Sequence, residues 1–225
     1  MKFTLKDYQT TAVRDVLANL RKARRRWHED ADKHAFSLAA TTGSGKTVMA
    51  AAVFEALIFG NDEFEFEPDP GAVVIWFSDD PSLNEQSKWR LQEASDKMTV
   101  SDLVTVGSTF NREKLEAGKV YFLNTQKLSK TSLLTRGHDP DDPDLETADG
   151  QKIMPDMRAF TIWDMIRNTI EDPDLTLYLV LDEAHRGMKD GGIATATGRP
   201  TIVKQLINGS GGTPGIPIVW GISEV

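Results

Sequence analysis

The sequence contains no cysteine among its 225 residues. Disulfides and thiolate metal sites are therefore excluded, which fits a cytoplasmic location without requiring one. No stretch approaches the run of about 18 apolar residues that a transmembrane helix needs. Residues 1–4 also lack the basic-then-apolar pattern that begins a signal peptide. We therefore expect a cytoplasmic protein with no membrane partner.

Basic residues are also in deficit, with 26 Lys and Arg against 34 Asp and Glu and a net charge of -8. Such an acidic balance is unusual for a protein that binds nucleic acid. The excess is local, because residues 61–70 hold five acids and residues 139–149 hold six, and neither segment contains a base. Outside them, 23 acids face the 26 basic residues. We predict that both segments are solvated loops, so the net charge does not exclude DNA or RNA.

Short apolar segments alternate with helical patterns along the chain. Helices are predicted at 7–20 (with Asp7 as the cap), 46–59, 83–94, 160–170 and 201–207, and strands at 35–40, 73–77, 103–106, 120–123, 177–181 and 218–222. Nearly continuous apolar strands separated by helices are typical of a parallel sheet covered on both faces. The sequence therefore predicts one α/β domain over residues 1–225.

Two further features leave their interpretation open. The basic run 21–27 follows the first predicted helix and would either track phosphates or form a solvated surface. The five tryptophans fit core or lobe-packing positions better than base stacking; they are Trp27, Trp76, Trp89, Trp163 and Trp220.

Residues 40–47 have the sequence Ala-Thr-Thr-Gly-Ser-Gly-Lys-Thr, between a predicted strand and a predicted helix. Glycines allow a tight turn whose N–H groups point at phosphate oxygens, and the helix N-terminus favours negative charge. Lys46 can reach the β- and γ-phosphates, and the Thr47 hydroxyl can ligate Mg²⁺. The alternative is a glycine-rich turn with an exposed lysine. The predicted nucleotide-binding residues are Thr42, Gly43, Ser44, Gly45, Lys46 and Thr47.

A second polar motif follows the predicted strand 177–181, which runs directly into Asp182 and Glu183. The carboxyl ends of parallel strands share one sheet edge, so these acids and the phosphate loop are expected at the same edge. Asp182 is suited to hold Mg²⁺, and Glu183 to orient and deprotonate an attacking water. The alternative is an ordinary acidic helix start. Together with Lys46, these acids form the predicted catalytic set.

The tetrad 182–185, Asp-Glu-Ala-His, resembles the DEAH form of the Walker B motif of superfamily 2 helicases. This resemblance implies the first RecA-like lobe of such an enzyme, with His185 coupling the nucleotide site to nucleic acid. Tyr8 and Gln9 resemble the N-terminal Tyr-Gln signature of the same superfamily. The resemblance implies that Gln9 contacts adenine, whose edge needs both a donor and an acceptor.

Three more segments resemble motifs of the same lobe. Residues 73–86 resemble motif Ia and residues 121–128 the Thr-Gln motif, which implies contacts to nucleic-acid phosphates from Ser78, Gln86, Thr125 and Gln126; ordinary polar strand ends are the alternative. Residues 218–223 resemble the strand entering motif III, where Ser223 would have a coupling role. The motif is incomplete here, so we expect a lobe truncated at motif III, without the second lobe.

Residues 124–128 and 182–188 look most like the helicase (Res) subunit of type III restriction enzymes. This implies an ATP hydrolase that moves on double-stranded DNA using ATP and Mg²⁺, with a second RecA-like lobe and a methyltransferase or specificity subunit as partners. By itself the chain is expected to turn over weakly or not at all. Two alternatives stay open: a nucleotide-, DNA- or partner-binding module with negligible turnover, and a different P-loop ATPase. The resemblance at 8–9 and 125–126 argues against the last.

Overall fold

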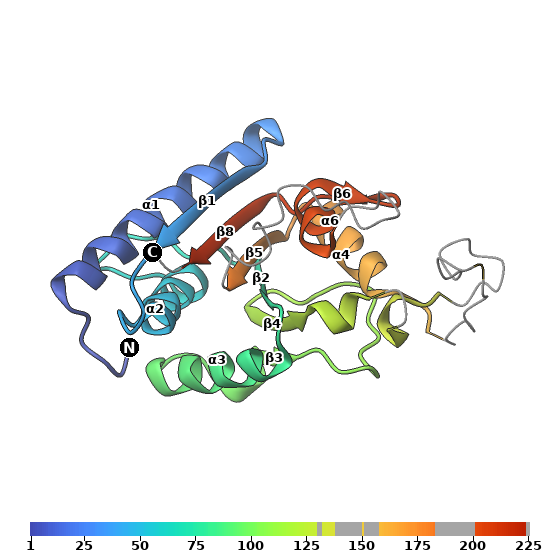
Figure 1. The fold of residues 1–225 in the computed structure, drawn as a ribbon. Helices are drawn as coiled ribbons and strands as arrows, with labels where there is room; N and C mark the ends of the chain where they lie inside the picture. Colours follow the sequence, from blue (N-terminus) through green and yellow to red (C-terminus); the bar gives the residue numbers. More distant parts are fainter. Residues whose placement is uncertain (130–131, 138–149, 151–157, 183–200, 224–225) are drawn as a thin grey trace.

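The computed structural model describes residues 1–129, 132–137, 150, 158–182 and 201–223. Its centre is a six-stranded sheet in the order β1-β8-β5-β2-β4-β3 (Figure 1). The strands are β1 (His34–Ala39), β2 (Ala72–Ser78), β3 (Leu103–Thr105), β4 (Lys119–Asn124), β5 (Thr176–Asp182) and β8 (Ile218–Ser223). All five pairings are parallel. A small antiparallel pair, β6 (Gly209–Ser210) and β7 (Thr213–Pro214), lies before β8.

Helices cover both faces of the sheet. The described α-helices are α1 (Asp7–Asp30), α2 (Lys46–Phe59), α3 (Pro81–Ala94), α4 (Ile162–Glu171) and α6 (Ile202–Asn208), and the short 3₁₀ helices are η1 (Val100–Asp102), η2 (Thr125–Leu128) and η3 (Leu133–Thr135). Within the described ranges, none of the helices is long and apolar enough to cross a membrane.

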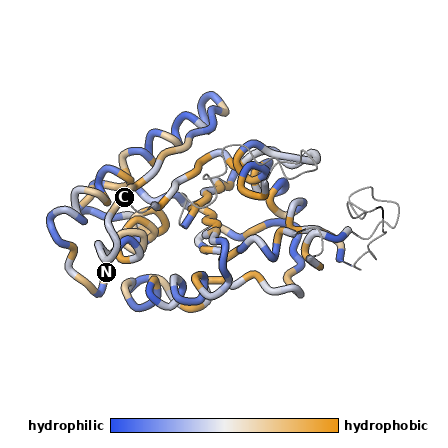
Figure 2. The backbone as a smooth tube through the Cα atoms, viewed as in Figure 1, coloured by the Kyte–Doolittle hydropathy of each residue, from blue (hydrophilic) through white to orange (hydrophobic). Residues whose placement is uncertain are grey.

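Two hydrophobic cores flank the sheet, because successive strand residues point to opposite faces. Val74 and Trp76 of β2 belong to the core under α1, α2 and α3, whereas Val73, Ile75 and Phe77 belong to the core under α4 and α6. Every residue of β2 is buried, as expected for an interior parallel strand. Hydrophobic segments accordingly run through the middle of the molecule (Figure 2). The predicted fold class, a parallel α/β domain covered on both faces, is confirmed.

Helix α1 differs from its prediction at both ends. It continues to Asp30 rather than stopping near residue 20, so the basic run 21–27 is helical. Arg and Lys are good helix formers, and burial of Ala23 keeps that part against the core. Asp7 is not the cap; Lys6 takes that position, and its N–H donates to Gln9 Oε1 at 2.9 Å.

The acidic segment 61–70 also differs, because it is not simply solvated. Phe66 is only 4% exposed, and Asn61 and Phe66 pair in an antiparallel bridge. The guanidinium carbon of Arg21 lies 5.2 Å from the Phe66 ring centroid, and Arg21 also donates to the Glu65 carbonyl. Phe64 and Phe66, which alternate with the acids, thus pack the segment against arginines of α1. The other acidic segment, 139–149, lies outside the described residues.

The tryptophans divide between core and surface. Trp76 and Trp220 are 1% and 2% exposed, and both contact Phe54 in an edge-to-face arrangement. Trp27 and Trp163 are partly buried against the second core. Trp89 is 62% exposed on α3, so of the two predicted positions the core is excluded for this residue and lobe packing stays a prediction.

Candidate nucleotide-binding site

The predicted phosphate loop connects β1 to α2. Gly43 and Gly45 have φ of +78° and +83°, a left-handed conformation that glycine adopts most readily. A turn closes over residues 41–44, where the Ser44 N–H donates to the Thr41 carbonyl at 3.1 Å. Helix α2 begins at Lys46, directly after Gly45. The predicted succession of strand, glycine-rich turn and helix N-terminus is therefore present.

The side chains of Lys46 and Ser44 lie close to the backbone of the loop. Lys46 Nζ donates to the Ala40 carbonyl at 3.3 Å, so the ammonium group lies across the loop. The Ser44 hydroxyl is buried and has no hydrogen-bond partner among the described residues. Thr41, Thr42 and Gly43 are exposed, so a ligand can approach the turn. An orphan hydroxyl, a lysine and a helix N-terminus fit the phosphate groups of a nucleotide.

The start of α1 is joined to the same loop. Gln9 Nε2 donates to the Ser44 carbonyl at 2.8 Å, and the Tyr8 hydroxyl donates to the same oxygen at 3.0 Å. Gln9 is only 7% exposed, whereas Tyr8 is 50% exposed. The Gln9 amide keeps one hydrogen and one lone pair beyond these bonds. Adenine contact by Gln9 stays a prediction, and the geometry adds a role in shaping the loop.

The Asp182 carboxylate lies at the end of β5, on the same sheet edge as the phosphate loop. Strand β8 separates β1 from β5, with Asp182 opposite Ile222. At the end of β8, the Ser223 carbonyl accepts from the Ala40 N–H at 3.1 Å, which ties this strand to the start of the loop. Thr47 lies in the first turn of α2 and is partly exposed. Glu183 and His185 lie outside the described residues.

Of the predicted nucleic-acid contacts, Ser78 is the least accessible. It is 1% exposed, and its hydroxyl lies 2.8 Å from Asn84 Oδ1 and 2.9 Å from the Asp80 carbonyl. A nucleic acid could reach that hydroxyl only if these contacts opened. Gln86 and Gln126 are exposed and Thr125 is partly exposed. Direct contact stays a prediction for all four, and the geometry favours the other three over Ser78.

Asn84 and Ser87 were not singled out from the sequence, yet both belong to this edge. Asn84 Nδ2 donates to the Leu123 carbonyl at 2.8 Å, and Ser87 Oγ donates to Asp182 Oδ2 at 3.3 Å. Both are on α3 and nearly buried, at 3% and 7% exposure. The signal available in the sequence was their spacing of three, which puts two small polar residues on the helix face toward the sheet.

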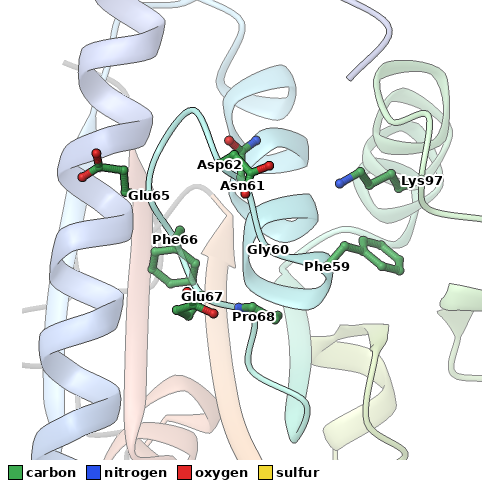
Figure 3. Close-up of a pocket in the computed structure, with 9 residues that line it drawn as sticks. All are labelled: Phe59, Gly60, Asn61, Asp62, Glu65, Phe66, Glu67, Pro68 and Lys97. Atoms are coloured by element: carbon green, nitrogen blue, oxygen red, sulfur yellow. The ribbon is translucent and has the colours of Figure 1, made fainter.

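A pocket of about 420 Å³ lies at the C-terminal end of α2 (Figure 3). Its lining includes Phe59, Asp62, Glu65, Glu67 and Lys97. The 14 residues of α2 put this pocket about 20 Å from the loop. It is therefore separate from the candidate nucleotide site, and its acidic lining does not suit phosphate.

A family model described as "Type III restriction enzyme, res subunit" matches residues 2–208. No curated protein matches the chain. One similar solved structure is a nuclease-deletion mutant of the Type ISP restriction-modification enzyme LlaGI in complex with a DNA substrate mimic, with TM-score 0.44 and 16% identity over 98% of this chain and 17% of that one. Another is a variant of S. cerevisiae Dbp5 bound to RNA and ADP BeF3, with TM-score 0.43 and 13% identity over 97% of this chain and 44% of that one.

The chain thus spans less than half of either solved relative. At these TM-scores neither likeness supports a functional argument. The family match is different, because it extends over most of the chain. It confirms the predicted resemblance to a helicase-type lobe, and we conclude that the chain belongs to the family of type III restriction enzyme res subunits.

Proposed function

We propose that this lobe binds ATP with Mg²⁺ at residues 40–47 and catalyses its hydrolysis, as the motor of an ATP-dependent helicase or translocase on double-stranded DNA of the type III restriction kind. The observation that carries this proposal is the junction of β1 and α2. There, two left-handed glycines stand at a helix N-terminus beside the buried Ser44 hydroxyl, which has no hydrogen-bond partner in the described part of the chain.

Lys46 and the loop backbone would bind the phosphates. The N–H groups at the start of α2 lack intrahelical partners and favour an anion. Lys46 would exchange its bond with the Ala40 carbonyl for phosphate oxygens, which carry full charge and make a stronger hydrogen bond. Ser44 would gain the hydrogen bond that it lacks within the described residues.

Thr47 and Asp182 would hold Mg²⁺, Asp182 through water. The bound ion would supply neutralising charge between the phosphate groups. Glu183 would take the proton of the attacking water. His185 and Ser223 would couple this chemistry to nucleic acid. These roles come from the resemblance; the hydrogen bond between the Ala40 N–H and the Ser223 carbonyl supports a link between β8 and the loop.

Two further sets of residues would contact the adenine base of ATP and the nucleic acid. Tyr8 and Gln9 would contact adenine while holding the Ser44 carbonyl. Gln86, Thr125 and Gln126 would contact DNA phosphates, which gives affinity without sequence choice. The expected protein partners are a second RecA-like lobe, which would supply cationic groups to the transition state, and a methyltransferase or specificity subunit. We also propose a cytoplasmic location.

ATP hydrolysis, measured with and without double-stranded DNA, tests this function. We expect nucleotide binding that requires Mg²⁺ and turnover that double-stranded DNA raises when a second lobe is present. RNA of equal length is the control for nucleic-acid class. Absence of Mg²⁺-dependent ATP binding would contradict the proposal. Equal stimulation by RNA would correct only the nucleic-acid assignment.

A further inference from the structure

Helix α3 is hydrogen-bonded to the carboxyl ends of three neighbouring strands, first β4 and β2 and then β5. Its inward residues are Asn84, Ser87, Leu91 and Ala94, so its buried stripe is polar in the first two turns and apolar afterwards. The polar part lies over the sheet edge that carries the candidate nucleotide site. Small polar residues at buried helix positions need partners, and here those partners are groups at the strand ends.

Asn84 connects the first two of these strands. Its side chain donates to the Leu123 carbonyl of β4 at 2.8 Å, and its amide oxygen lies 2.8 Å from the Ser78 hydroxyl of β2. Beside it, Thr125 Oγ1 donates to Asp79 Oδ1 at 3.0 Å, which links the loops that follow the same two strands. The segments that resemble nucleic-acid motifs are therefore fixed to α3.

Ser87, one turn further along α3, contacts the end of strand β5. Its hydroxyl donates to Asp182 Oδ2 at 3.3 Å across the boundary between helix and sheet. Ser87 is 7% exposed and Asp182 is partly exposed, so this hydrogen bond is shielded from water on the Ser87 side only. Asp182 sits just beyond the pairing of Phe77 with Leu181, so β2 and β5 end side by side under α3.

We propose that Ser87 is a positioning residue for the proposed Mg²⁺ site, because its hydroxyl holds the Asp182 carboxylate in the orientation that binds the ion. Helix α3 links this hydrogen bond to the segments 78–86 and 123–125, which it contacts through Asn84. The proposal rests on the proposed function. A carboxylate that receives a fixed hydrogen bond loses less rotational freedom on binding the ion, and supporting groups of this kind alter metal affinity by about 10- to 100-fold. Ser87 touches neither ATP nor the reacting water in this account.

The test measures the Mg²⁺ concentration that half-saturates binding of a fluorescent non-hydrolysable ATP analogue to the full chain. We expect Ser87→Ala to raise this midpoint about 10-fold, the low end of that range because Asp182 is partly exposed. Binding in EDTA should stay within about twofold of wild type, because the phosphate loop is untouched. Ser37→Ala, an exposed serine on β1, is the matched control and should change neither value.

Two further variants separate positioning from general loosening of α3. Ser87→Thr retains the hydroxyl and should restore the wild-type midpoint. In an Asp182→Asn background, Ser87→Ala should add less than about twofold, because residues that act through one another are not additive. If Ser87→Ala fails to fold, Ser87→Cys tests the same point, since a thiol has similar size but is a weaker donor.

The outcomes separate this inference from the proposed function. If wild type binds the analogue without any Mg²⁺ dependence, the proposed Mg²⁺ site and the role of Ser87 both fall. If wild type shows the dependence and Ser87→Ala has the same midpoint, only the role of Ser87 is overturned. An additive effect in the Asp182→Asn background would equally show that Ser87 does not act through Asp182.

Discussion

Replacement of Gly45 by alanine should disrupt the candidate site through one specific contact. Gly45 has φ of +83°, and a Cβ built there would lie 2.5 Å from Gln9 Nε2. That distance is too short for any real contact, so Gln9 would have to move. Gln9 is only 7% exposed and its Nε2 donates to the Ser44 carbonyl at 2.8 Å, so movement breaks one of the two bonds from α1 to that carbonyl and leaves only the one from Tyr8.

The expected cost has two parts. A left-handed conformation costs a residue with a Cβ about 1–2 kcal/mol. Loss of the bond from Gln9 to Ser44 adds about 1 kcal/mol. Gly43→Ala is the matched control, because Gly43 has φ of +78° but its added Cβ would meet nothing within 4 Å. Gly43→Ala should therefore cost only the conformational part, and the two variants should differ by about 1 kcal/mol.

Urea denaturation in the absence of nucleotide measures both unfolding free energies. The decisive comparison repeats both glycine substitutions in a Gln9→Ala background, where the Gly45 variant has no side-chain amide to displace. There we expect the difference between the two variants to vanish. An equal cost for Gly43→Ala and Gly45→Ala with Gln9 present, or a difference that persists without Gln9, would refute this reasoning.

Two further predictions concern other parts of the chain. Tyr178→Phe removes the bond from the buried Tyr178 hydroxyl to Asp69 Oδ2 at 2.7 Å and should cost about 1–3 kcal/mol of unfolding free energy at pH 7. Burial, and then the charge and hydrogen bond of Asp69, raise the pKa of Tyr178 well above its usual value of 10.0. The stabilising contribution is therefore complete below about pH 10 and is lost as the pH rises from there toward the folded-state pKa. Denaturation at pH 7 and pH 11 should show wild type and variant converging, and a constant gap would contradict this. Glu183→Gln in a protein with both lobes should retain ATP binding but lose hydrolysis; a normal ATPase rate would show that Glu183 is not the general base.

Most of the fold could be predicted because its interior strands β2, β4, β5 and β8 are buried on both faces. Helix α2 has the bounds that the sequence predicted, and β2 differs from its prediction by one residue at each end. The end of α1 was missed because charged residues such as Arg25 do not reveal whether a helix continues. The segment 61–70 was predicted to be a solvated loop because it contains five acids and no base. Phe64 and Phe66 are nevertheless buried, at 9% and 4% exposure. The guanidinium groups that lie over these two rings belong to Arg14 and Arg21, more than 40 positions earlier in the chain.

The candidate site was predictable where its chemistry follows consecutive residues. The loop 40–47 and Asp182 needed only local patterns beside an apolar strand. The bonds of Asn84 and Ser87 depend on how α3 lies over strands that are distant in the sequence, so no local pattern contained them. The exposure of Trp89 likewise could not be predicted from a local pattern, because it depends on which face of α3 packs against the sheet.

Calorimetric titration of ATP with Mg²⁺ into this chain and into its Lys46→Ala variant tests the central claim most directly. Lys46 is the one cation that the loop itself contributes, and its ammonium group already lies across the loop. We predict Mg²⁺-dependent binding by wild type and no measurable binding by the variant, with both proteins equally folded by circular dichroism. Equal ATP affinity of the two proteins would contradict the assignment of residues 40–47 as the nucleotide site.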